Sequence, residues 1–180
     1  MPTLAPYRNY NDHDVIQNFT FSGTLPVSKG TFVKVISGLM TDQNLVMLGS
    51  VGAAWANTVS QKYGIQPTIG ACTSSGDNAL GMLLYDVKIV DENDEVLLYH
   101  PEKAAQMQVS LSGQPTPVVT RGIFLYSGAS GTPVAGGKAY LANNGLIQYL
   151  APDAVATATR VGTFLGPKDS AGFAYIKINL

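Results

Sequence analysis

The chain has 180 residues, a mass of 19.0 kDa and a formal net charge of −1. This length is typical of one domain, or of one domain with an extension. With 11 Lys and Arg against 12 Asp and Glu, the sequence lacks the basic excess that binds nucleic acid or an anionic membrane surface, so neither partner is predicted. No apolar run approaches ~18 residues, and no basic region precedes an apolar run, so neither a membrane span nor a signal peptide is predicted.

Charged residues make up only 13% of the chain, about half of the ~25% typical of soluble domains. Either uncharged polar side chains dominate the surface, or partner chains cover much of it, because the cores of interfaces are poor in charge. We favour the second interpretation, which predicts a homo-oligomer. The single cysteine, Cys72, excludes an internal disulfide and is predicted to be a small buried hydrophobic side chain.

Residues 1–24 differ in composition from the rest of the chain. They contain two early prolines, several Asn and Asp residues and spaced aromatic residues, which predicts an extended N-terminal arm. Disordered segments are poor in aromatic residues, so we expect the arm to lie on its own body or on a neighbouring chain. The candidate partner-binding residues of this arm are Tyr7, Tyr10, His13, Phe19 and Phe21.

The remaining residues, 25–180, are predicted to form a β-rich body. The chain has 19 Gly and 10 Pro, and turn-forming residues separate short apolar segments every ~8–12 residues, as in β-sandwiches and β-barrels. Residues 50–63 are ambiguous between a short helix and two strands, and residues 116–180 are predicted to form a small barrel subregion. The predicted strands cover residues 30–37, 44–49, 81–90, 95–99, 117–126, 160–165 and 172–180, and residues 134–141 contain a predicted tight turn at Gly136-Gly137.

Two local patterns in the middle of the body are clear. Residues 81–90 and 95–99 predict a hairpin, joined by the turn Asp91–Asp94. The acidic turn is interpreted as solvated. The alternative, a calcium loop, would require a glycine and a glutamate that are missing here. Residues 101–107 predict the one short helix, because a proline at the first helical position is followed by good helix formers.

No catalytic constellation stands out from the sequence. His13 lies between two Asp residues, but neighbours in an extended segment point to opposite faces, which favours a polar patch. His100 is interpreted as structural. The loop Gly70–Gly76 lacks both the Gly-Lys-Ser/Thr ending of a phosphate loop and the Gly-x-Ser-x-Gly pattern of a serine nucleophile. We therefore predict that the chain is not an enzyme and has no catalytic, cofactor-binding or metal site.

Several segments nevertheless resemble one class of viral protein. The strand Gln114–Ile123 is followed by the turns Gly137-Lys138 and Asn144-Gly145, and then by Val161–Leu165 and Gly172–Leu180. This succession resembles the small β-barrels of capsid decoration (cement) proteins of tailed bacteriophages. Two further segments resemble virion-associated proteins of cyanophage-type and related tailed phages, and these are Tyr10–Ile16 and Gly81–Val87.

The resemblance implies a structural virion protein, made in the host cytoplasm, that binds the outer capsid surface. Its partner would be the major capsid protein, whose neighbouring subunits it would clamp, often as a homotrimer. No catalytic residues are carried over, since this family has none. The alternative that the sequence leaves open is a β-module that binds surface glycans.

Overall fold

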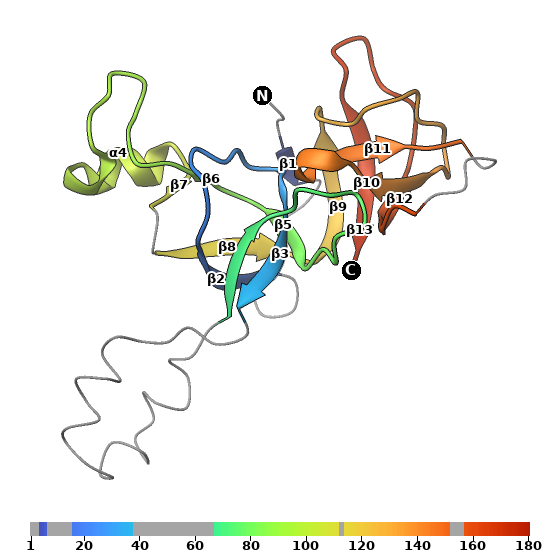
Figure 1. The fold of residues 1–180 in the computed structure, drawn as a ribbon. Coiled ribbons are helices and arrows are strands. Elements are labelled where there is room, and N and C mark those ends of the chain that lie inside the picture. Colours follow the sequence, from blue (N-terminus) through green and yellow to red (C-terminus); the bar gives the residue numbers. More distant parts are fainter. Residues whose placement is uncertain (1–3, 7–15, 38–66, 112–113, 152–156) are drawn as a thin grey trace.

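The computed structural model describes residues 4–6, 16–37, 67–111, 114–151 and 157–180, which form a barrel, a curved sheet and a small lobe (Figure 1). The fold is mostly β, with 9% helix, which confirms the predicted fold class. The predicted strand at residues 44–49 and the ambiguous segment at 50–63 lie outside the described residues. No helix among the described residues is long and apolar enough to cross a membrane.

The barrel is closed by five short strands. All its neighbouring strands are antiparallel except β2 and β4, which run parallel, and β8 closes the barrel by pairing with β2. In barrel order the strands are β2 (Ile16–Phe21), β4 (Thr68–Ala71), β3 (Phe32–Ser37), β5 (Gly81–Leu83) and β8 (Pro115–Val119). Its interior is filled by buried side chains that include Phe21, Val33, Ile69, Leu83 and Val118.

The second body is a six-stranded antiparallel sheet. In spatial order its strands are β1 (Leu4–Pro6), β9 (Arg121–Tyr126), β13 (Ala174–Asn179), β12 (Arg160–Phe164), β10 (Lys138–Leu141) and β11 (Ile147–Tyr149). The predicted alternation in the last strand is confirmed, because Ala174, Ile176 and Ile178 are buried and the residues between them are exposed. An isolated parallel bridge joins Ser130, in the segment after β9, to Gln148 of β11.

The inner face of the sheet packs against the barrel. Phe124, Phe164 and Ile176 of the sheet share one core with Phe32 and Met82 of the barrel, so the two bodies are joined by buried apolar contacts. The turn η3 (Asn143–Gly145) lies against strand β3, and a Cβ at Gly145 would lie 2.8 Å from Thr31 Cγ2. The predicted burial of Cys72 is also confirmed.

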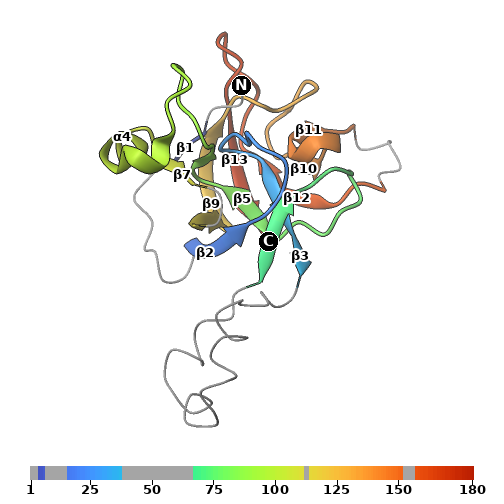
Figure 2. The ribbon, with the colours of Figure 1, turned by 60° about the vertical axis from the view of Figure 1, so that its left-hand side comes forward.

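The third part, which we call the lobe, comprises residues 85–111 and lies on the side of the barrel away from the sheet in Figure 1, and Figure 2 shows its helix α4 projecting at one edge of the molecule. Its elements are β6 (Asp86–Val87), η2 (Leu97–Tyr99), α4 (Pro101–Gln106) and β7 (Val109–Ser110). Strands β6 and β7 pair in parallel, and Leu97, Ala104 and Val109 form a small separate core. Helix α4 confirms the predicted short helix at 101–107.

Two sequence-based assignments in the body are wrong. The predicted hairpin of residues 81–90 and 95–99 forms only next to its turn, where Val90 and Val96 form an antiparallel bridge flanked by the backbone hydrogen bonds Leu97 N–H to Ile89 O and Asp91 N–H to Glu95 O. Its predicted outer parts do not pair: β5 enters the barrel, β6 pairs with β7, and residues 97–99 are 3-10 helix. The predicted strand at 117–126 breaks at Thr120, so β8 belongs to the barrel and β9 to the sheet. The subregion 116–180 is consequently not one barrel.

The boundary of the predicted arm is also wrong. Residues 16–21 form β2, a strand of the closed barrel, and residues 4–6 pair with β9 at the edge of the sheet. Phe19 and Phe21 are two positions apart on β2, so they share one face, and both side chains are buried. The structure therefore places these two rings in the core of this chain, where they cannot contact a partner.

Candidate interaction surface

The lobe ends in an acidic turn, residues 91–95, whose conformation is set by Asp91. The buried Asp91 carboxylate accepts hydrogen bonds from the backbone N–H groups of Asn93 (2.7 Å) and Glu95 (2.9 Å), and it forms an ion pair with Lys103 of α4. The hydrogen bond from Lys103, followed by those from the backbone, lowers the pKa of Asp91 to about 2. The turn is thereby tied to the helix, and the other acidic side chains at its tip stay exposed.

Three carboxylates of this turn, the alternative calcium ligands, are already paired with a lysine. Asp91 already has Lys103 and two backbone N–H groups as partners, while Glu92 and Glu95 lie 3.8 and 3.6 Å from the same ammonium group. Across the described ranges, no group of three or more His, Cys, Asp or Glu side chains is arranged to hold a metal ion. The turn is best described as a lysine-centred ionic cluster.

The lobe also concentrates exposed apolar side chains. Six of the twelve large hydrophobic side chains that are exposed in the described part of the chain lie between residues 85 and 99. Tyr99 is 76% exposed, Leu98 61% and Ile89 51%. Single exposed apolar side chains are ordinary, but a group of them on one small element marks an interaction site. The six side chains are those of Tyr85, Ile89, Val90, Val96, Leu98 and Tyr99.

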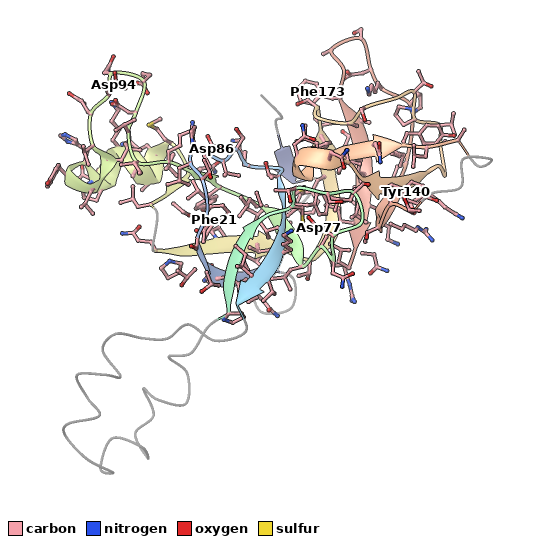
Figure 3. All side chains as sticks on the ribbon, in the orientation of Figure 1. Phe21, Asp77, Asp86, Asp94, Tyr140 and Phe173 are labelled. Atoms are coloured by element: carbon pink, nitrogen blue, oxygen red, sulfur yellow. The ribbon has the colours of Figure 1, made fainter. Side chains whose placement is uncertain are left out.

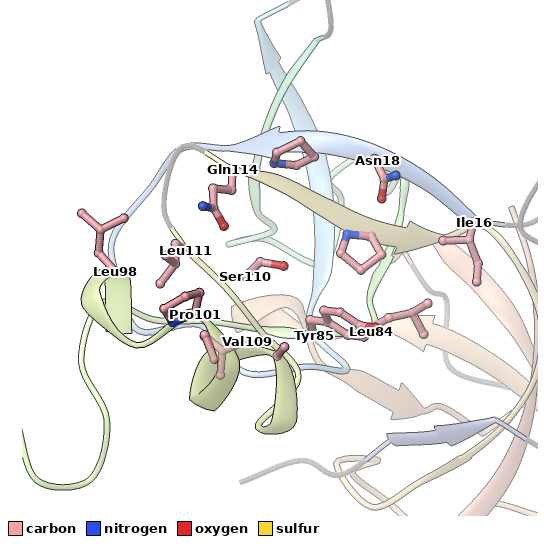
Figure 4. Close-up of a pocket in the computed structure, with 14 residues that line it drawn as sticks. Ile16, Asn18, Leu84, Tyr85, Leu98, Pro101, Val109, Ser110, Leu111 and Gln114 are labelled. Atoms are coloured by element: carbon pink, nitrogen blue, oxygen red, sulfur yellow. The ribbon is translucent and has the colours of Figure 1, made fainter. Parts of the chain in front are cut away.

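A cleft of about 830 Å³ separates the lobe from barrel strands β2 and β8 (Figure 4). Its lobe wall comes from Leu98, the small and apolar residues of α4, and Val109. Its barrel wall comes from Ile16 and Asn18 of β2 and the prolines of β8. Tyr85 is the one aromatic side chain among the described residues that line the cleft. The cleft is therefore lined by polar and apolar groups alike, and the exposed side chains of Tyr85 and Leu98 form part of it.

The loop from Cys72 to Asp77 is held by a different carboxylate. Asp77 Oδ2 accepts hydrogen bonds from the backbone N–H groups of Thr73 (2.9 Å) and Ser74 (3.0 Å), and from Lys34 Nζ (2.9 Å). The backbone bond from Ser74 is the largest cause that lowers the pKa of Asp77 to about 2. Two backbone N–H groups of the loop are thus bonded to Asp77, and those of Ser75 and Gly76 donate to Asn143 Oδ1 and Ser74 Oγ.

Cys72 is unsuited to nucleophilic chemistry in this setting. Burial is the main cause that raises the pKa of the Cys72 thiol to about 11, and the nearby Asp77 carboxylate raises it further. Thiolate is the nucleophilic form of cysteine, so a raised pKa suppresses its reactivity. Cys72 therefore serves packing between the barrel and the sheet.

The sequence-predicted contact residues are not brought together as one site. Phe19 and Phe21 lie in the barrel core, and Tyr7, Tyr10 and His13 lie outside the described residues, so their role as contacts stays a prediction. Sequence reasoning missed the lobe as a surface. The apolar residues Leu98 and Tyr99, which come shortly before the helix-starting Pro101, were interpreted as part of a hairpin strand at residues 95–99.

Comparison with models of known protein families finds no match, and comparison with curated proteins finds no similar chain. Function is therefore inferred from the surface and its chemistry. A fold alone would not be sufficient for this purpose, since one fold supports many functions.

Proposed function

We propose that this chain is a structural virion protein that binds the outer surface of a tailed-phage capsid and stabilises contacts between major capsid subunits. The observation that carries the proposal is the number of exposed apolar side chains on the lobe, two of which, Tyr85 and Leu98, line an 830 Å³ cleft. Such a surface gains free energy when a partner covers it. The resemblance of the sequence to capsid decoration proteins supplies the identity of that partner.

The lobe and cleft would contact an apolar segment of a major capsid subunit. Tyr99 offers a large ring with few rotatable bonds, which is a favoured anchor at the centre of an interface. A protein that binds the assembled shell and not free subunits stabilises the shell by mass action. Catalysis has no part in this proposal, and neither does a cofactor. The chain would act on the virion surface, as a homo-oligomer and most simply as a trimer.

A second candidate function is binding of surface glycans. It is favoured by the polar side chains of Asn18, Ser110 and Gln114, which line the same cleft with Tyr85. Sugar sites combine such hydrogen-bonding groups with an aromatic ring. A glycan array separates the two candidates, because specific binding that Tyr85→Ala abolishes would favour the glycan function over capsid binding.

Sedimentation of the purified chain with expanded capsids of the phage that encodes it tests the proposal. The test variant is Ala105→Arg, which places a long charged side chain in the cleft from an exposed position of α4. The matched control is Gln106→Arg, because Gln106 is its exposed neighbour on α4 and does not line the cleft. Both changes suit a helix and avoid the core.

We expect the wild-type chain and Gln106→Arg to sediment with the capsids, and Ala105→Arg to bind at least about tenfold more weakly. Shells of an unrelated phage serve as the control for nonspecific binding. A wild-type chain that stays in the supernatant at tens of micromolar would contradict the capsid function. Equal binding by both variants would show that the cleft is not the contact.

A further inference from the structure

The outward face of the six-stranded sheet carries a group of basic side chains, Arg121, Lys138, Arg160 and Lys177, which we call the cationic face. Lys177 of β13 and Lys138 of β10 both lie opposite Thr163 of β12, so these side chains share one cross-strand row. Arg160 lies opposite Tyr140, and Arg121 lies opposite Asn179. All four basic residues are exposed.

The structure leaves these charges uncompensated. None of the four basic side chains forms an ion pair with another residue in the part of the chain that the structure describes. Arg160 is oriented by hydrogen bonds to Thr163 Oγ1 (3.1 Å) and the Gly162 carbonyl (3.4 Å). A shallow groove of about 320 Å³ lies between Arg160 and Lys177. Such a groove can accept carboxylates.

Negative charge is concentrated in the lobe, at the end of the molecule opposite the cationic face. Residues 85–111 contain six acidic and two basic side chains, a net charge of −4, whereas the described residues from 121 to 180 contain five basic and one acidic, a net charge of +4. Figure 3 places Asp94, in the acidic turn, and Tyr140, on the cationic face, at opposite ends. The near-zero net charge of the chain thus conceals a strong separation of charge.

We propose that the cationic face binds the acidic turn of a second copy of this chain, so that copies associate head to tail. The two surfaces are complementary in charge, and their positions at opposite ends prevent them from meeting within one chain. The exposed acids Glu92, Asp94 and Glu95 supply the carboxylates, and Lys138, Arg160 and Lys177 receive them. The turn lies outside the lining of the 830 Å³ cleft, so the cleft stays open for another partner.

This inference deepens the proposed self-association by naming its two surfaces, and it does not depend on capsid binding. A head-to-tail interface joins two different patches, so it generates a closed ring when the rotation between copies closes, and an open chain otherwise. A trimer built in this way would be a three-membered ring. Because exposed charges attract over about 10 Å at 0.1 M salt and much less at 1 M, the association should weaken as salt is added.

Sedimentation velocity of the purified full chain between 1 and 100 μM tests the inference. The first variant, Lys138→Glu with Lys177→Glu, reverses two charges of the cationic face. The second variant, Glu92→Lys with Glu95→Lys, reverses two charges of the acidic turn and keeps both residues of the Asp91–Lys103 pair. The control is Lys168→Glu, because Lys168 lies in the loop between β12 and β13, away from the groove. Thermal melting confirms that each variant folds.

We expect the wild-type chain and Lys168→Glu to associate at low salt and to dissociate towards 0.5 M NaCl. Each double variant alone should associate at least about tenfold more weakly, and an equimolar mixture of the two should form hetero-dimers, since each keeps one intact surface and the two reversed surfaces attract each other. If both double variants associate as strongly as the wild-type chain, the proposed interface is wrong, although the chain still self-associates. A wild-type chain that stays monomeric between 1 and 100 μM would contradict both the interface and self-association. The capsid function would then still be tested separately by capsid sedimentation.

Discussion

Replacement of Phe21 by alanine tests whether residues 16–21 belong to the core or to a gripping arm. The Phe21 side chain is 2% exposed and packs with Val33, Ile69 and Leu83 inside the barrel. Loss of roughly 150 Å² of buried apolar surface at about 25 cal/mol per Å² gives about 4 kcal/mol, within the range of about 3–5 kcal/mol measured for such core truncations. This is a large part of the ~5–15 kcal/mol by which domains are stable.

The assay is thermal and urea unfolding followed by circular dichroism, together with capsid sedimentation. We expect Phe21→Ala to lower the unfolding midpoint by about 10 °C, whereas Tyr99→Ala, which removes an exposed ring, should change the free energy of unfolding by less than about 0.5 kcal/mol. An unchanged midpoint for Phe21→Ala, combined with lost capsid binding, would refute the core placement and restore the arm interpretation.

Three further predictions concern packing and titration. A Cβ at Gly162 would lie 2.2 Å from the Lys177 carbonyl oxygen, so Gly162→Ala should cost at least about 2 kcal/mol in urea unfolding, whereas Gly166→Ala, which meets nothing within 4 Å, should be nearly neutral. Because the pKa of Cys72 is raised to about 11, iodoacetamide at pH 8 should label this thiol only in urea, and rapid labelling of the folded chain would contradict its burial. The pKa of Asp91 is lowered from 3.8 to about 2, so its stabilising effect is complete above about pH 4 and is lost as the pH falls towards 2. Amide exchange in the lobe should accelerate over that interval, and Asp91→Asn should remove the transition.

The elements that sequence analysis predicted correctly are those with strong local signals. Residues 174–179 alternate between aliphatic and other side chains, and β13 shows the same alternation in its burial. Pro101 begins α4, and Asn144 adopts the positive φ of 74° that an Asn-Gly turn favours. Each of these signals lies within a few residues of the element that it predicts, so no tertiary information was needed.

The errors arose where pairing is not local. Asp86–Val87 pairs with Val109–Ser110 across more than twenty residues, so the apolar run from 81 to 90 resembled one continuous strand although it serves two sheets. Similarly, Thr120 carries no sequence signal that predicts the end of the barrel strand β8 and the start of the sheet strand β9. The aromatic residues at positions 19 and 21 have the two-residue spacing of a strand. The polar residues around them nevertheless favoured the interpretation as an extended arm.

The candidate surfaces were only partly predictable for a related reason. Clustering of acids between residues 86 and 102 and of basic residues after 120 is visible in the sequence. Strand register decides which of these side chains share a face. For example, Lys138 and Lys177 lie on either side of Thr163 because both are its cross-strand partners. The exposure of Leu98 and Tyr99 depends equally on the short 3-10 helix that replaces the expected strand.

Electron cryomicroscopy of capsids of the tailed phage that the proposed function implies, incubated with saturating amounts of the purified chain, tests that function most directly. We predict density on the outer surface that crosses a boundary between major capsid subunits, with the lobe and its cleft facing the shell and the acidic turn of each copy beside the sheet of the next. Shells without added density would contradict the capsid function, and density in which the lobe points into solvent would contradict the assigned contact surface.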